Sequence, residues 1–193
     1  MRTAFVLLLA PLIAVAAPVP KLKAKADFYP SAVGTKWVYA NEDGTNEHSR
    51  EVTASTEKDG VTTFTITWKQ GAQTQTWEMT KDADGVSRVS QNGSVFDPPH
   101  PIVKQKMAEG DEWESEYTLG RGATKYHQKR TVGKEEKVKV LAGEYSAIPL
   151  ASVDLNGNTI DTTLWYADGV GLVKIVPKDG VPIVLKEFVP AKK

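Results

Sequence analysis

Alternation of apolar and polar residues is the main pattern of this chain beyond its first thirty residues. In Thr62–Trp68, the residues Phe64, Ile66 and Trp68 fall on one face and threonines fall on the other. This period of two, rich in β-branched and aromatic residues, predicts a half-buried strand. No segment carries an apolar helical stripe over several turns. Further strands are expected near 36–40, 47–56, 73–80, 86–91, 113–119, 124–132, 135–141, 145–154, 159–166, 170–176 and 182–188.

Turn signals separate the expected strands. Pairs such as Asp59-Gly60, Asn92-Gly93 and Asn156-Gly157 are typical of hairpins that join antiparallel strands. The pattern predicts an all-β single domain, an antiparallel meander of roughly ten to twelve strands curved into a barrel or half-barrel. A short helix over 101–109 is the one helical element that the pattern allows.

The chain also repeats part of its own pattern. Gly34–Trp37 (Gly-Thr-Lys-Trp) is echoed by Gly110–Trp113 (Gly-Asp-Glu-Trp), and Trp77 and Trp165 each precede an Asp-Gly-Val turn. We interpret this as an internal duplication, with the Pro-rich segment Asp97–Pro101 as the joint. The alternative is that β-hairpins share a common vocabulary. Half of the chain is small for a core of its own, so one continuous sheet is expected.

The first residues predict an export signal. Arg2 gives a positive start, and the apolar run Ala4–Ala16 ends in two small residues, Ala14 and Ala16, at the spacing that a signal peptidase reads. We therefore expect a signal peptide over 1–16. A buried helix or a membrane anchor is the alternative, but a bilayer span needs roughly 20 apolar residues and this run is shorter.

The rest of the chain is expected to form one exported unit. Residues 17–27 hold two prolines and three lysines and predict a flexible leader, followed by a single β domain over 28–190. The chain has no cysteine, so disulfides, thiolate metal sites and the anchoring cysteine of a bacterial lipoprotein are not expected. We expect a soluble protein that is periplasmic or secreted and does not span the membrane.

Charge and histidine content argue against several function classes. The 24 basic and 24 acidic residues balance, so no basic footprint for nucleic acid exists. No His-Glu-x-x-His motif, nucleophile elbow or phosphate-binding loop occurs. His48 and His127 are expected to face solvent and His100 to lie in a loop. We therefore expect no catalytic residues, no metal and no cofactor.

Three glutamates form a row along one expected strand. Glu112, Glu114 and Glu116 alternate along one expected strand and so share a face. A solvated, charge-paired surface is the favoured interpretation, and a carboxylate site is the alternative. Basic residues that could pair with the row follow it: Arg121, Lys125, Lys129 and Arg130.

Five tryptophans are the most informative side chains for function. Core packing is one interpretation, since large aromatics dominate β cores. The other is a cavity, because a wide sheet curls and its concave face can hold an apolar ligand. The expected wall of such a pocket is Trp68, Trp77, Trp113, Trp165 and Tyr166.

Three motifs resemble a group of exported bacterial proteins. Asp27–Tyr39 is similar to their Tyr-Pro-Leu-x-x-Gly-x-x-Trp-x-Tyr start, Leu141–Tyr145 to their Pro-Ala-Gly-Thr-Phe segment, and Trp165–Lys174 to their Trp-Tyr-Ala-Pro-Gly-Val-Gly-Leu-Val-Lys end. Ser31 and Asp168 depart from these patterns. The group is a β-rich domain family of unknown function. The resemblance implies a β-meander loosely like the half-barrels of lipoprotein carriers, and it implies no catalytic residues.

Three functional hypotheses follow. The first is a non-enzymatic exported module that binds something apolar in its curved sheet, such as a lipid or the signal-like tail of a partner. The second is a structural or interaction protein of the envelope, with a filled core and an active outer surface. The third is a hydrolase whose site converges from distant strands.

Overall fold

The computed structural model describes residues 26–120 and 124–192. The expected signal peptide lies outside the described residues, as does all of the expected leader except Ala26 and Asp27. The described part is built from strands: β1 (Lys36–Asn41), β2 (His48–Lys58), β3 (Val61–Gln70), β4 (Gln73–Lys81), β5 (Gly85–Gln91), β6 (Ser94–Lys104), β7 (Glu112–Leu119), β8 (Lys125–Val132), β9 (Glu136–Val140), β10 (Gly143–Asp154), β11 (Thr162–Ala167), β12 (Gly171–Pro177) and β13 (Ile183–Val189).

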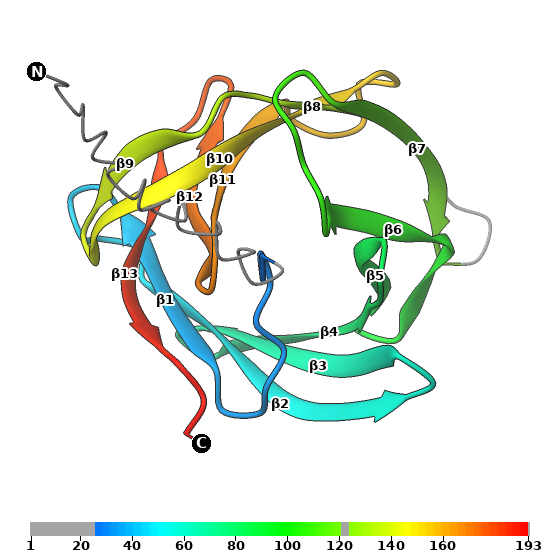
Figure 1. Cartoon of the computed structure of the whole chain (residues 1–193), viewed down its shortest axis with the longest axis horizontal. Coiled ribbons are helices and arrows are strands. Elements are labelled where there is room, and N and C mark those ends of the chain that lie inside the picture. The colour runs from blue at the N-terminus through cyan, green and yellow to red at the C-terminus, as the bar shows by residue number, and fades with distance from the viewer. Residues whose placement is uncertain (1–25, 121–123, 193) are drawn as a thin grey trace, which may run out of the picture.

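The strands form a closed antiparallel meander (Figure 1). Neighbours in the sequence pair from β1 to β8, β10 pairs with β8 and β11, and β13 returns to pair with β1. Twelve strands therefore close into a barrel, and β9 is an additional strand on β10. The predicted all-β barrel is confirmed, with thirteen strands instead of ten to twelve. The helix allowed over 101–109 was wrong, because Pro101–Lys104 completes β6.

The additional strand β9 continues β8 along the same edge of β10. Val132 at the end of β8 lies opposite Leu150, and Glu136 at the start of β9 lies opposite Ala147. The intervening Gly133 donates a backbone hydrogen bond to the Pro149 carbonyl (2.8 Å). β8 and β9 thus behave as one long strand with a break, so the barrel closes with twelve strands although thirteen are present.

The two Gly-x-x-Trp segments have the same backbone construction. The N–H groups of Gly34 and Gly110 donate to the carbonyls of Val52 and Val132, both at 2.9 Å. Each valine N–H in turn donates to the residue that follows the glycine. Both glycines have a positive φ, +89° and +87°, which glycine adopts at little cost. These two segments therefore share a backbone geometry as well as a sequence pattern.

Residues 26–31, which we call the strap, cross one end of the barrel before β1 begins (Figure 1). The Asp27 N–H donates to Asp168 Oδ1 (2.7 Å), and Lys81 Nζ donates to Asp27 Oδ1 (2.7 Å). Phe28 and Tyr29 are buried against the core. The part of the expected leader that is described, Ala26 and Asp27, is thus tied to the barrel.

Alternation sorts the strand residues into an outer face and a lumen face. Phe64, Ile66 and Trp68 lie opposite Met79, Trp77 and Gln75, and residues that face each other across antiparallel strands share a face. Phe64 and Ile66 are fully buried, and the threonines between them lie on the outer face. No helix of the described residues is long and apolar enough to cross a membrane.

Candidate functional site

All three arginines of the described residues point into the lumen. Arg50 lies opposite Trp37 and Trp68, and Arg88 lies opposite Met79. Arg130 is in phase with buried Val132 and opposite Trp113, so it shares the lumen face of β7 and β8. We call Arg50, Arg88 and Arg130 the lumen arginines.

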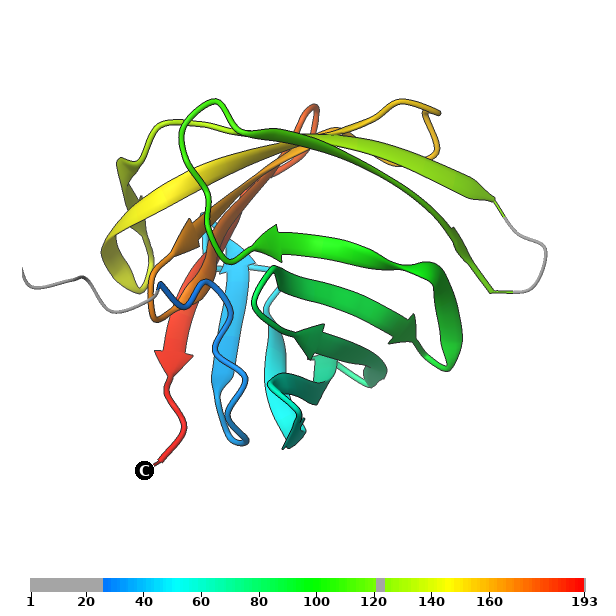
Figure 2. The ribbon, with the colours of Figure 1, turned by 45° about the vertical axis from the view of Figure 1, so that its right-hand side comes forward.

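Arg130 is fixed to the wall of the barrel. It is only 4% exposed, and its Nη1 donates to the carbonyls of Pro101 and Ile102, the latter at 3.0 Å. β6 and β7 pair only at Phe96 and Asp97 and then diverge, as Figure 2 shows. The carbonyls of β6 therefore lack a strand partner beyond this point, and Arg130 supplies the missing donors.

His100 completes the attachment of Arg130. Its Nε2 lies 2.8 Å from Arg130 Nη2, and its ring stacks on Tyr117 with centroids 4.1 Å apart. Burial, and then the charge of Arg130, lowers the pKa of His100 to about 2. The neutral ring can therefore accept a hydrogen bond from the guanidinium. The expectation that His100 lies in a loop was wrong, because it is a buried residue of β6.

Another lumen histidine also departs from expectation. His48 was expected to face solvent, but it is buried and stacks on Tyr39 with centroids 5.3 Å apart. Burial, with Arg50 nearby, lowers its pKa to about 4. Both histidines are therefore neutral at pH 7 and add no charge to the lumen.

Arg50 and Arg88 are held by aromatic rings instead of by carbonyls. Their guanidinium carbons lie 5.0 and 4.4 Å from the centre of the Trp77 ring, and Arg50 also lies 4.8 Å from Tyr39. Arg88 has one hydrogen bond, a 3.3 Å contact to Gln91 Oε1. No acceptor of the described residues bonds the Arg50 side chain. Burial, and the charge of Arg50, lowers the pKa of Arg88.

Several buried polar atoms that face the lumen have no hydrogen-bond partner. In the part of the chain that the structure describes, six buried side-chain N or O atoms lack a hydrogen-bond partner. All six belong to residues whose strand positions face the lumen, and five of them are N–H groups that can only donate. The atoms are Arg50 Nε, Trp77 Nε1, Arg88 Nε, Trp113 Nε1, Ser115 Oγ and Arg130 Nε.

No carboxylate balances the lumen arginines within the described ranges. The ion pairs found there all use lysine or histidine as the cation. Buried charges in proteins are normally paired, because the loss of hydration is costly. An arginine cannot escape this cost by losing its proton. Asp154, a buried carboxylate opposite Gln128, accepts from Asn156 and Thr159 instead. The lumen arginines therefore have no ion-pair partner among the described residues and have donors to spare.

Tyr166 lies on the lumen face of β11 and also lines a cavity beside the strap. This cavity measures about 490 Å³, and its lining includes Phe28, Met107, Ile148 and Tyr166. Burial raises the pKa of Tyr166 to about 12, even though all three lumen arginines act to lower it. Its neutral hydroxyl is one more donor on the lumen face, and the cavity beside it has both apolar and charged lining residues.

The structure brings together four of the five expected wall residues. Trp68, Trp77, Trp113 and Tyr166 have strand positions that face the lumen. Trp165 lies on the other face of β11, where its Nε1 donates to Glu136 Oε1 at 2.6 Å in an exposed position. The alternation along β11 separates it from Tyr166, so Trp165 does not line the lumen.

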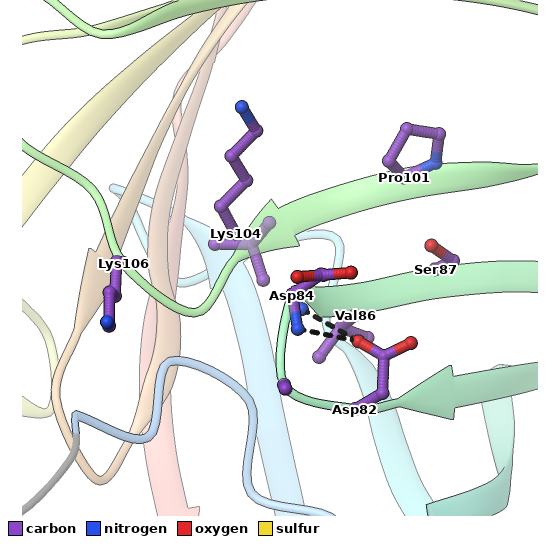
Figure 3. Close-up of a pocket in the computed structure, with 10 residues that line it drawn as sticks. Asp82, Asp84, Val86, Ser87, Pro101, Lys104 and Lys106 are labelled. Carbon is purple, nitrogen blue, oxygen red and sulfur yellow. Dashed lines mark hydrogen bonds between the residues drawn. The ribbon is translucent and has the colours of Figure 1, made fainter. Parts of the chain in front are cut away.

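A second hollow lies at the turn between β4 and β5 (Figure 3). It measures about 590 Å³, and Asp82, Asp84, Lys104 and Lys106 are among its lining residues. Asp82 Oδ1 accepts the N–H groups of Asp84 (2.8 Å) and Gly85 (3.1 Å). The carboxylate is thus used to hold the turn, and none of the lumen arginines lines this hollow.

The row of glutamates lies on the outer face of β7. Lys129 Nζ pairs with Glu112 at 2.8 Å, and His127 Nε2 pairs with Glu114 at 2.8 Å. Of the expected partners, Lys129 takes part and Arg121 lies outside the described residues, whereas Arg130 points into the lumen. Among the described residues, no group of three or more His, Cys, Asp or Glu is placed to hold a metal ion.

Comparison with known proteins places the fold. No family model matches the chain, and no curated protein matches it. A crystal structure described as "a putative lipoprotein" from Parabacteroides distasonis aligns with 86% of this chain and 100% of its own, at a TM-score of 0.50 and 15% identity. A "putative exported protein with YmcC-like fold" from Bacteroides fragilis aligns with 85% of this chain and 99% of its own, at 0.46 and 16%. The barrel therefore shares its fold with the bacterial protein described as a putative lipoprotein.

Proposed function

We propose that this chain is a non-enzymatic, exported binding protein that holds a small amphipathic molecule in the lumen of its barrel. The observation that carries the proposal is the location of the unpartnered polar atoms. All six face one lumen, and they come from both halves of the barrel. A bound molecule that brings acceptors would satisfy several of them at once.

The size and lining of the barrel support the same function. Eight strands enclose an interior that side chains just fill, and a barrel of twelve is wider. Trp68 and Trp113 point inward yet are only half-buried, so part of each side chain remains accessible to a ligand. Aromatic walls with a few polar groups are typical of small-molecule sites.

The test is the entry of a neutral apolar probe, N-phenyl-1-naphthylamine, into the mature protein. We expect saturable fluorescence enhancement with energy transfer from tryptophan. Ser115→Phe should abolish it by replacing an unpartnered hydroxyl with a ring that fills the lumen at this position. Thr63→Phe places the same bulk on the exposed outer face of β3 and should leave binding unchanged.

The competing function, an envelope interaction protein with a filled core, predicts the opposite result. Stacked rings of Phe96, His100, Tyr117 and Tyr126 already fill the β6–β7 side of the lumen. If wild-type protein gives no saturable signal, or if Ser115→Phe and Thr63→Phe behave alike, the binding proposal fails and the surface function is favoured.

A further inference from the structure

We infer that the ligand of this barrel carries an acidic group, and that this group binds to Arg50 and Arg88 beside the Trp77 ring. The inference rests on the proposed function and adds the chemical class of the ligand: an oxyanion, carboxylate or phosphate, joined to an apolar body.

Charge points to an acidic ligand. The guanidinium carbons of Arg50 and Arg88 lie 5.0 and 4.4 Å from the centre of one ring, that of Trp77, and the charge of Arg50 acts to lower the pKa of Arg88. No carboxylate of the described residues pairs with any of them. A neutral ligand would satisfy hydrogen bonds but would leave the charge uncompensated, whereas an anion answers both requirements.

The contacts of the three arginines show where the anion binds. The terminal nitrogens of Arg130 are already occupied by Pro101, Ile102, His100 and Gln128. Among the described residues, no acceptor bonds the Arg50 side chain, and Arg88 has a single 3.3 Å contact to Gln91. Both guanidinium groups lie at the same indole, with their carbons 5.0 and 4.4 Å from the centre of the Trp77 ring, so the region beside this ring holds two cations with donors to spare.

The contact with aromatic rings does not supply an acceptor to these guanidiniums. The guanidinium carbons of Arg50 and Arg88 lie over ring faces, which attract the cation, and the N–H donors can still bond an oxygen acceptor. Those donors match the two oxygens of a carboxylate or a phosphate. Arg50 and Arg88 are half-buried in spite of their inward position, which leaves room for such a partner.

The apolar part of the ligand has a place as well. The lining of the cavity of about 490 Å³ beside the strap includes Met107, Ile148 and Tyr166, and Tyr166 lies on the lumen face of β11. An acyl or alkyl chain in this cavity would lie with its acidic end toward Arg50 and Arg88. The ligand class is therefore an anionic amphiphile.

The experiment is isothermal titration of the mature protein with dodecanoate, dodecyl phosphate and dodecan-1-ol below their critical micelle concentrations. These probes share one chain length and differ in the head group. We expect wild-type protein to bind at least one anion about tenfold or more tighter than the alcohol, since hydrogen bonds to charged groups are the strong ones. The preferred anion distinguishes a carboxylate ligand from a phosphate ligand.

Arg50→Gln and Arg88→Gln should each reduce the preference for the anion, and the double variant should abolish it. Lys129→Gln removes the same charge from the outer face and should change nothing. Retained binding of the alcohol shows that a variant is folded.

Equal affinity of wild-type protein for the alcohol and both anions would overturn the inference and leave the proposed function standing. Failure to bind any of the three probes would remove the proposed function itself. The comparison in wild-type protein needs no variant, so it decides the inference even if Arg88→Gln does not fold.

Discussion

Arg50 and Arg130 occupy corresponding positions in the two halves of the barrel, yet their side chains make different contacts. Each lies two residues before the valine that receives the glycine N–H of its Gly-x-x-Trp segment, and each lies opposite the tryptophan of that segment. Arg130 is bonded to the carbonyls of β6. Arg50 lies over the rings of Tyr39 and Trp77, and no acceptor among the described residues bonds its side chain.

The difference arises from the strand that each arginine can reach. In the second half, β6 and β7 diverge after two paired residues and leave carbonyls exposed to Arg130. In the first half, β13 and β1 stay paired from Lys36 to Asn41, so no free carbonyl is offered to Arg50. The same local construction thus yields one arginine that completes the wall and one that remains available for a ligand.

The largest effect that separates the two positions should be on stability. Arg130→Met removes charged hydrogen bonds and leaves buried carbonyls unsatisfied, so the free energy of unfolding should fall by about 3 kcal/mol. Arg50→Met removes an uncompensated charge and should lie within about 1 kcal/mol of wild type, or be more stable. Urea denaturation of both variants without ligand measures the contrast, and equal losses would contradict it.

Low pH should reduce the stability of the barrel because two of its histidines are buried in the neutral form. The pKa of His100 falls to about 2 and that of His48 to about 4, from 6.5. The unfolded chain therefore binds more protons below pH 6.5, and stability decreases as the pH falls from there. At pH 5 the loss should be about 2 kcal/mol for each histidine.

Urea denaturation from pH 7.5 to 5 measures this loss, and His100→Gln should flatten about half of it. A stability that does not change over this range would show that the histidines are not buried as described.

The shared backbone construction should give equal effects in the two halves. Gly34→Ala and Gly110→Ala place a side chain at φ values of +89° and +87°, with no atom within 4 Å of the added Cβ. Each should cost about 1–2 kcal/mol from backbone conformation alone. Thermal or urea unfolding measures the pair, and clearly unequal costs would mean that the two turns are not equivalent.

The smallest effect should belong to the outer face. Lys129 pairs with Glu112 while both side chains are more than a third exposed, and such pairs contribute less than about 1 kcal/mol. Lys129→Gln should therefore be nearly silent in urea, although Lys129 is the neighbour of Arg130 in the chain. A loss as large as that of Arg130→Met would contradict the assignment of these two faces.

The sequence predicted the strands and turns well because they depend on local chemistry. The alternation in Val61–Gln70 and the Asn-Gly and Asp-Gly turns could be read without knowledge of the rest of the fold. The repeated Gly-x-x-Trp segments also pointed to two similar halves. The wrong helix over 101–109 fell where β6 pairs with β5 but not with β7, and this pairing is a property of tertiary structure.

The lumen arginines were missed because polar residues in a strand are usually assigned to the solvent face. A signal was present: Arg50 is in phase with Val52, and Arg130 is in phase with Val132, whereas Lys129 is not. The period of two therefore placed both arginines on the apolar face. The missing carboxylates and the divergence of β6 from β7 depend on distant strands and could not be read from the sequence.

The central claim is that Arg50 and Arg88 receive an anion inside the barrel, and a crystal structure of the mature protein with dodecanoate tests it most directly. The account predicts a carboxylate within about 3 Å of guanidinium nitrogens of both arginines, with the chain directed toward Ile148 and Tyr166. A lumen in which these arginines pair with a carboxylate of the protein itself, or in which the carboxylate lies in solvent, would contradict it.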